Sequence, residues 1–209
     1  METIQLDRGI HKSFDYIVNS LLSYSFIGAG LNSYVGCNMP RQNAEIAMGG
    51  NPKVSNLAIG FRPFRILETI FRGGWPNNIE LLVYKLPNNS NINAHPKIPR
   101  ANVLTGAGYA LGFNMMSSFV SFYESVKERT EEKFGANPNN WPATLNFCRV
   151  IRNAFSHNGV IDFRNKKAAA VSWRSLRYSP SDNGSQILFR DLACAEIILL
   201  MVEFDAFLV

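Results

Sequence analysis

Apolar residues recur at intervals of three and four positions in several stretches of the chain, a spacing that predicts amphipathic helices with one buried face. The first such stretch is His11–Ile27. A second, Arg62–Phe71, begins with Pro63 and is stopped by Gly73 and Gly74. The second half of the chain predicts a long helix over Leu111–Phe134, another over Pro142–His157 and a terminal helix over Asp191–Val209.

Helical spacing is absent from several segments between these helices. Gly28–Gly60 is rich in Gly, Asn, Ser and Pro, so we expect mostly irregular structure there, with a short helix near Gln42–Met48. Ile79–Leu86 fits either a strand or a short helix. The polar run Pro87–Pro96 is expected to be an exposed loop.

Two short runs near the C-terminus, Ala168–Trp173 and Gln186–Phe189, predict the strands of a hairpin with a long turn. Together with the helices they predict a mainly α fold, a helical bundle that carries a small C-terminal β-hairpin. A chain of 209 residues fits one domain. We therefore expect a single domain over 1–209, with its core at about 105–209 and a loop-rich elaboration over 28–100.

The composition favours a folded protein, since 46% of the residues are apolar and only 18% are charged. The net charge of +5 is compatible with a polyanionic partner. Cys37, Cys148 and Cys194 lie far apart and show no paired spacing, which argues against a disulfide framework or a zinc site. Because no other metal or nucleotide-loop motif is present, we expect no metal and no cofactor.

The two ends of the chain bear on its location. The N-terminal residues lack the basic-then-apolar order of a signal peptide. The run Leu192–Val209 is apolar, but Glu196, Glu203 and Asp205 interrupt it, which favours a packed helix over a membrane span. We therefore expect a cytoplasmic protein without a membrane partner.

The residues with the most chemistry lie on the Pro142–His157 helix. At about 100° per residue this helix has one apolar and one polar side. The apolar side is expected to face the core and consists of Phe147, Cys148, Val150, Ile151, Ala154 and Phe155. The polar side consists of Asn146, Arg149, Arg152, Asn153, Ser156 and His157. Since the helix has no carboxylate, its arginines are suited to a phosphate.

The spacing within the polar side favours acid–base chemistry on a phosphate. Asn153 and His157 lie four positions apart, so their side chains are expected to hydrogen-bond and fix the imidazole tautomer. Arg152 lies further round, which leaves room for a phosphate between it and His157. The alternative is ordinary helix-end chemistry, in which Arg152 and His157 only complement the helix dipole before the stop at Gly159.

The run Arg152-Asn153-Ala154-Phe155-Ser156-His157, followed by Asn158-Gly159, resembles the arginine–polar–histidine signature of the HEPN superfamily of small helical proteins. The resemblance covers Leu111–Val209 and implies a HEPN-like helical bundle. It also implies a metal-independent endoribonuclease, usually a homodimer, in which arginine and histidine from two copies meet in one cleft. Such enzymes leave 2′,3′-cyclic phosphate ends on RNA.

Residue by residue, the resemblance implies that Arg152 holds the scissile phosphate and stabilises its developing charge. Asn153 would orient the histidine, and His157 would act as the general base or general acid. RNA is then the expected substrate. An antitoxin protein is a further expected partner if the protein is a toxin or an anti-phage effector.

Five further residues are candidates for binding RNA or phosphate, namely Arg149, Ser156, Asn158, Arg164 and Lys166. The basic residues among them can extend into a surface that follows an RNA backbone, with aromatic side chains between them to stack on bases. The residues of this extension are Lys167, Arg174 and Arg177, and the aromatic ones are Phe163, Trp173 and Tyr178. The alternative is a solvated basic exterior around buried aromatics.

Two non-catalytic functions fit the same polar face. One is a module that binds RNA, a nucleotide or a protein, and the other is a helical dimer whose arginines pack against the second copy. Glu196 and Glu203 share a helix face and either pair with these arginines, mark a dimer surface or form an ordinary exposed stripe. Among these functions only the enzyme predicts a histidine-dependent pH profile.

Overall fold

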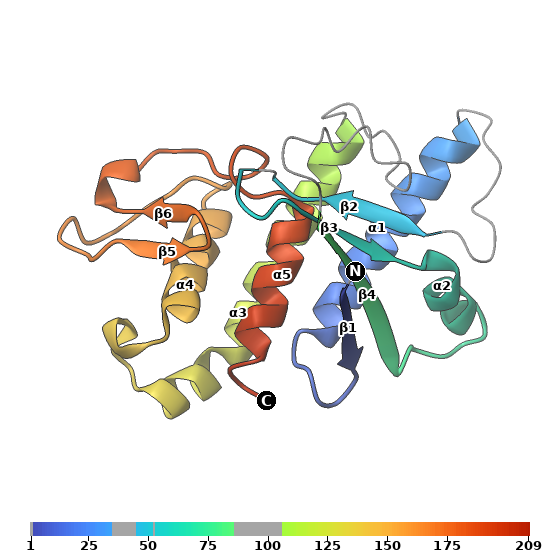
Figure 1. Ribbon diagram of the computed structural model, residues 1–209, viewed down its shortest axis with the longest axis horizontal. Helices are drawn as coiled ribbons and strands as arrows, with labels where there is room; N and C mark the ends of the chain where they lie inside the picture. Colours follow the sequence, from blue (N-terminus) through green and yellow to red (C-terminus); the bar gives the residue numbers. More distant parts are fainter. Residues whose placement is uncertain (1, 35–44, 52, 86–105) are drawn as a thin grey trace.

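The computed structural model describes residues 2–34, 45–51, 53–85 and 106–209 and shows a mixed α/β fold. The expected mainly α bundle is therefore wrong. A four-stranded antiparallel sheet in the order β1-β4-β3-β2 occupies the N-terminal half (Figure 1). Its strands are β1 (Glu2–Asp7), β2 (Ile46–Gly49), β3 (Leu57–Phe61) and β4 (Asn78–Lys85).

The described ranges contain five α-helices, some beside the sheet and others further away from it. Figure 1 shows the sheet at one end of the molecule and α4 with a small hairpin at the other, with α3 and α5 between them. The helices are α1 (Phe14–Tyr34), α2 (Pro63–Phe71), α3 (Gly106–Phe134), α4 (Ala143–Ser156) and α5 (Cys194–Asp205). None of the helices in the described ranges is both long and apolar enough to cross a membrane.

The sheet accounts for the segment in which irregular structure was expected. All five residues of β3 are buried, and its alternate side chains enter two different clusters. Leu57, Ile59 and Phe61 join the main core, whereas Ala58 packs on the opposite face of the sheet. Ile46–Met48 lies in β2 rather than in a short helix, while residues 42–44 and the expected loop over 87–96 lie outside the described residues.

One hydrophobic core joins the sheet to the helices. Phe122 of α3 and Phe204 of α5 meet edge to face with ring centroids 5.5 Å apart, and Phe119 and Phe155 join α3 to α4 at the same distance. Cys148 is fully buried in this core, and its burial raises the pKa of the thiol well above 9.0. The apolar side predicted for the Pro142–His157 helix, which is α4, is thus confirmed as a core face.

The C-terminal hairpin pairs different strands from those expected. Val171–Trp173 (β5) pairs with Leu176–Tyr178 (β6), and Arg174 takes a left-handed φ of 52° in the turn between them. Gln186 instead forms an isolated bridge with Val160, just after α4. The expected pairing with a long turn is therefore wrong, because a two-residue turn closes the hairpin earlier.

A buried polar junction connects the β2–β3 loop to the start of α5. The carboxylate of Glu196 is completely buried and accepts hydrogen bonds from the N–H of Asn51 at 2.8 Å, the N–H of Ala193 at 3.0 Å and the hydroxyl of Ser55. Burial raises the pKa of this carboxyl above its ordinary 4.5, and these hydrogen bonds oppose the shift. Glu196 is therefore not part of an exposed stripe.

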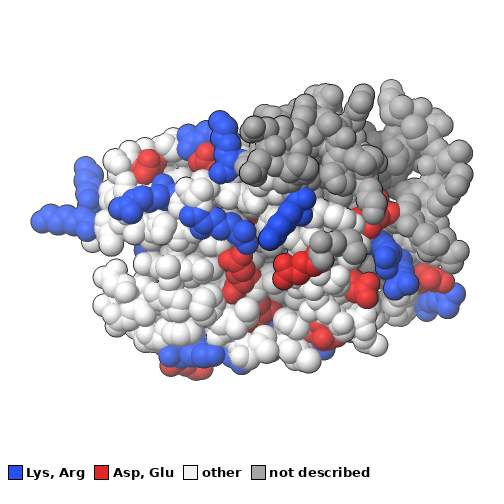
Figure 2. All heavy atoms as spheres, in the orientation of Figure 1, with Lys and Arg blue, Asp and Glu red and all other residues white. Residues whose placement is uncertain are grey.

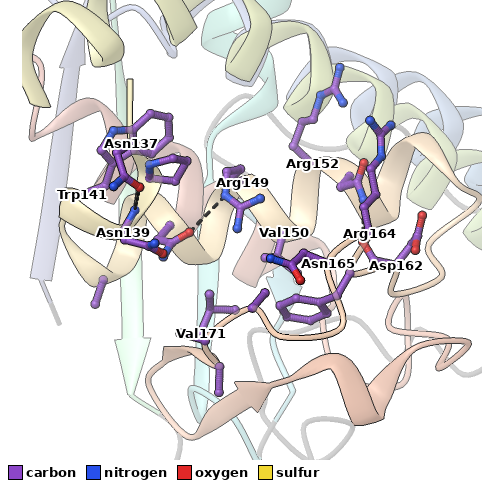
Figure 3. A pocket seen from close by; sticks show the side chains of 18 of the residues that line it. Asn137, Asn139, Trp141, Arg149, Val150, Arg152, Asp162, Arg164, Asn165 and Val171 are labelled. Carbon is purple, nitrogen blue, oxygen red and sulfur yellow. Dashed lines mark hydrogen bonds between the residues drawn. The ribbon is translucent and has the colours of Figure 1, made fainter. Parts of the chain in front are cut away.

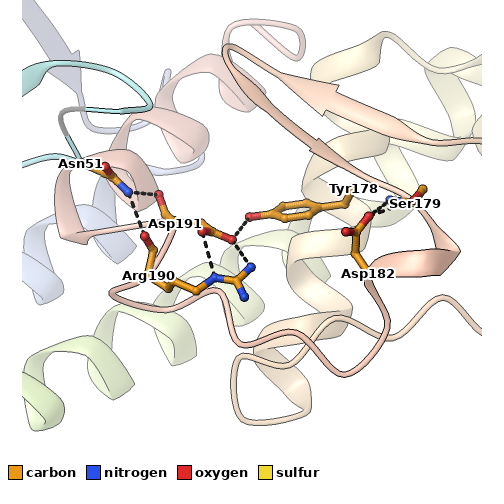
Figure 4. Close-up of polar contacts among 6 residues, drawn as sticks. All are labelled: Asn51, Tyr178, Ser179, Asp182, Arg190 and Asp191. Carbon is orange, nitrogen blue, oxygen red and sulfur yellow. Dashed lines mark hydrogen bonds and ion pairs between the residues drawn. The ribbon is translucent and has the colours of Figure 1, made fainter.

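The side chain of Asn51 continues this junction. Figure 4 shows its amide donating to the backbone carbonyls of Arg190 and Asp191, at 3.0 and 3.1 Å. The carboxylate of Asp191 in turn accepts the hydroxyl of Tyr178 at 2.9 Å, which fixes the end of β6. The sheet and the C-terminal segment are therefore held together by specific hydrogen bonds as well as by the core.

A candidate phosphate-binding cleft beside α4

The end of α4 is well defined, as the Asn-Gly pair predicts. Asn158 takes a left-handed φ of 57°, and the N–H of Gly159 donates to the carbonyl of Ala154 at 2.8 Å. This is the hydrogen bond of a Schellman cap, in which a left-handed residue follows the last helical turn. His157 is the C-cap residue, so its backbone position is fixed at the helix end.

A cleft of about 910 Å³ lies between α3, α4 and the loop over residues 162–172. We call it the basic cleft, after the five basic residues among those that line it: Lys127, Arg149, Arg152, Arg164 and Lys167. Its amide side chains are Asn137, Asn139, Asn146, Asn153 and Asn165, and its carboxylates are Glu124, Glu131 and Asp162. Figure 2 shows further basic side chains over the end of the molecule that carries the β5–β6 hairpin.

Arg149 lies near the centre of the basic cleft (Figure 3). It is partly buried, and its Nε donates to Oδ1 of Asn146 at 3.1 Å. No carboxylate of the described residues lies within 4.0 Å of its guanidinium nitrogens. An arginine in a concave site without a counter-ion is an available anchor for an anion.

Arg152 also lines the basic cleft, but it has a counter-ion. Its Nη2 forms an ion pair with Oε1 of Glu124 on α3, and the two side chains are 31% and 43% exposed. The Nε of Arg152 is buried and has no hydrogen-bond partner among the described residues. The carboxylate thus satisfies only part of the guanidinium.

Asn153 contacts the loop over residues 162–172 rather than His157. Its side-chain amide donates to the backbone carbonyl of Asp162 at 2.6 Å. In the described part of the chain no hydrogen bond joins Asn153 to His157, so the expected hydrogen bond between these two side chains is not formed. A second contact holds the same loop, since Oδ1 of Asn183 accepts the N–H of Phe163 at 2.7 Å. Arg164, the next residue, is thereby held at the cleft.

His157, Ser156 and Asn158 are exposed at the end of α4, outside the lining of the basic cleft. The hydroxyl of Ser156 donates to the carbonyl of Arg152 at 3.1 Å, within the helix. Lys166 is also exposed and outside the lining. The structure therefore divides the expected site residues into two groups. Those in the cleft are Arg149, Arg152, Asn153 and Arg164, and those outside it are Ser156, His157, Asn158 and Lys166.

The aromatic residues expected to stack on RNA bases are instead part of the core. Phe163, Trp173 and Tyr178 are only 4–5% exposed. Trp173 and Tyr178 stack on Phe147 of α4, with centroid distances of 5.9 and 5.7 Å. The solvated basic exterior around buried aromatics is therefore the correct alternative at these three residues.

Several cleft residues were not predicted from the sequence, among them Glu124, Asn146 as a partner of Arg149, and Asn165. Glu124 is one of several charged residues in the second half of α3, and its sequence context does not distinguish it from an ordinary solvated helix residue. Only the packing of α3 against α4 brings it to Arg152. Burial raises the pKa of the Tyr123 phenol, which also lines the cleft, above its ordinary 10.0, so this group stays neutral.

In the described ranges no group of three His, Cys, Asp or Glu side chains is placed to hold a metal ion. Comparisons of the chain with protein-family models, with curated protein sequences and with solved structures found no match. The case for a function therefore rests on the basic cleft and on the motif beside it.

Proposed function

We propose that this protein binds RNA or a nucleotide through phosphate groups held in the basic cleft. The observation that carries the proposal is Arg149, a partly buried guanidinium in a concave site with no carboxylate partner among the described residues. Guanidinium groups bind phosphate through two parallel hydrogen bonds, which makes arginine the preferred residue for such sites.

The other cations of the cleft support an anionic ligand. Lys127 pairs with Glu131 at 3.9 Å and Arg152 pairs with Glu124, whereas Arg164 and Lys167 form no ion pair with a described carboxylate. Amide side chains around them supply donors and acceptors that suit ribose hydroxyls and base edges. The combination fits a nucleic-acid phosphate better than a simple carboxylate ligand.

The proposal is tested by measuring the affinity of the protein for a fluorescent single-stranded RNA in excess chelator, with wild type and Arg149→Ala. We expect about a tenfold loss of affinity in Arg149→Ala, because one charge-assisted phosphate contact disappears. Arg177→Ala is the matched control, since Arg177 is an exposed arginine of β6 outside the cleft. Equal affinities of Arg149→Ala and wild type would rule out the cleft as the binding site.

RNA cleavage is the second candidate function, and the exposure of His157 at the end of the helix that carries Arg152 favours it. An exposed imidazole at the end of a fixed helix is accessible to a 2′-hydroxyl or a leaving oxygen. Arg152 lines the basic cleft and His157 does not. The expected homodimer would supply the second group from the other copy.

Cleavage is tested separately from binding. Purified protein is incubated with mixed RNA in excess chelator beside His157→Ala, and the ends of the products are analysed for 2′,3′-cyclic phosphate. The substitution should leave the fold intact, because an exposed side chain at a helix end contributes little to stability. If both proteins cut equally, His157 is not the acid–base group; if neither cuts while both bind RNA, the protein is a binding module.

A further inference from the structure

The counter-ion of Arg152 is itself a cleft residue. Glu124 reaches Arg152 from α3 and pairs with its Nη2, while the buried Nε of the same guanidinium has no hydrogen-bond acceptor among the described residues. A buried donor without an acceptor is unfavourable, because it has lost its water and gained no partner. A tetrahedral phosphate can use Nε and Nη2 together, which is the two-point geometry that one carboxylate oxygen leaves incomplete.

We propose that Glu124 is a specificity-determining residue that occupies Arg152 in the free protein and must be displaced by the ligand, so that the basic cleft prefers a terminal phosphate to an internal phosphodiester. This inference rests on the proposed binding of phosphate in the cleft. The two partners are 31% and 43% exposed, and an ion pair with that much solvent access is weak. Glu124 is therefore displaced at little cost by an anion of higher charge.

Charge explains the preference. An internal phosphodiester carries one negative charge, as the Glu124 carboxylate does. When such a phosphodiester replaces Glu124 at Arg152, the electrostatic energy of Arg152 is therefore nearly unchanged. A terminal phosphomonoester carries nearly two charges at neutral pH, because its second pKa is about 6. Its extra charge is stabilised by Arg149 and Arg164, neither of which pairs with a described carboxylate. Displacement of Glu124 is thus favourable only for the terminal group.

The test compares the affinity of the intact protein for one single-stranded RNA with a 5′-phosphate, with a 3′-phosphate and with hydroxyls at both ends, and for free adenosine 5′-monophosphate. We expect wild type to bind one phosphorylated end about tenfold more tightly than the hydroxyl RNA, which is one favourable charge-assisted contact. If free adenosine 5′-monophosphate binds about as tightly as the phosphorylated RNA, a nucleotide is a sufficient ligand. If the free nucleotide does not bind, the ligand is the phosphorylated end of an RNA.

The variants assign the preference to Glu124. Glu124→Gln should tighten binding of the hydroxyl RNA and reduce the preference to about twofold, because Arg152 is then free for any phosphate. Glu131→Gln is the matched control, since Glu131 also lines the cleft from α3 but pairs with Lys127. In an Arg152→Gln background Glu124→Gln should have no further effect on the preference.

The outcomes separate this inference from the proposed function. If wild type binds RNA in an Arg149-dependent way but binds all three RNAs equally, Glu124 does not create a preference for a terminal phosphate. The inference is then wrong, while the proposed function stands. Equal effects of Glu124→Gln and Glu131→Gln would likewise overturn the inference, since cleft charge alone would explain them. If no ligand binds to wild type or to Glu124→Gln, the proposed function and the inference both fail.

Discussion

The side-chain amide of Asn153 donates a 2.6 Å hydrogen bond to the backbone carbonyl of Asp162. This contact joins the last turn of α4 to the loop that carries Arg164 and Lys167, two of the cations of the basic cleft. A residue expected to orient His157 thus holds the opposite wall of the cleft.

Asn153→Asp should therefore weaken both the fold and the binding of RNA. An aspartate cannot donate to the carbonyl of Asp162 and repels it, so we expect a loss of about 1–3 kcal/mol in the free energy of unfolding. Asn165→Asp is the control, because it adds the same charge to the cleft but keeps the acceptor that binds the N–H of Lys167. Urea denaturation and RNA titration of both variants check this. Equal stability of the two would show that the Asn153 contact does not hold the loop.

The buried carboxyl of Glu196 predicts a specific pH dependence of stability. Its pKa in the folded protein is raised above the ordinary 4.5, mainly by burial. The folded state then retains the proton to higher pH than the unfolded state, so the contribution of this group is fully present below pH 4.5 and is lost as the pH rises through the folded pKa. Lowering the pH from neutral towards 4.5 should stabilise wild type relative to Glu196→Gln.

This prediction is checked by urea denaturation of both proteins at several pH values, since the difference between them removes the effects of the other titrating groups. Glu128→Gln is the control, because Glu128 is an exposed carboxylate of α3. If the difference between wild type and Glu196→Gln stays constant, or moves in the opposite direction, the pKa of Glu196 is not raised in the folded protein.

The parts of the fold that could be predicted were those with strong local patterns. The helix over residues 142–157 has a complete apolar side and an Asn-Gly stop, and the structure confirms its extent closely as Ala143–Ser156. The strands β2 and β3 have no such pattern. In β3 the small residues Ala58 and Gly60 lie on one face and larger apolar residues lie on the other, and both faces are buried, so the apolar–polar alternation of a half-exposed strand is absent. The pairing of β3 with both β2 and β4 explains why this segment is extended.

The cleft was predictable only in part, for a related reason. Helical spacing correctly placed Arg149 and Arg152 on one polar side of α4. It also placed Asn153 beside His157, but spacing along one helix contains no information about the loop that returns to it. Glu124 is distant in sequence from Arg152, and its contact arises from the crossing of α3 and α4. Tertiary contacts of this kind decide which cations remain available to a ligand.

Asn158 allows one pair of variants to test both the backbone of the helix end and the role of this side chain in RNA binding. Its φ of 57° is left-handed, a region that glycine adopts freely and alanine does not. Asn158→Ala should be less stable than Asn158→Gly by about 1–2 kcal/mol, measured by chemical denaturation. Both variants lose the amide, so equal RNA affinities at or near the wild-type value would confirm that this side chain lies outside the binding site. A weaker RNA affinity in both variants would show that the Asn158 side chain takes part in phosphate binding.

The salt dependence of RNA binding distinguishes the cleft from the general basic surface. Each phosphate neutralised on a single strand contributes about −0.7 to the slope of log K against log salt concentration. Arg164 lines the cleft and Lys166, two positions later in the same exposed loop, does not. Arg164→Gln should therefore reduce the magnitude of the slope by about 0.7, while Lys166→Gln leaves it nearly unchanged. The slopes are obtained by measuring the RNA affinity of wild type and both variants from low to high salt concentration. An equal reduction in the two would mean that RNA follows the outer face of the loop instead of entering the cleft.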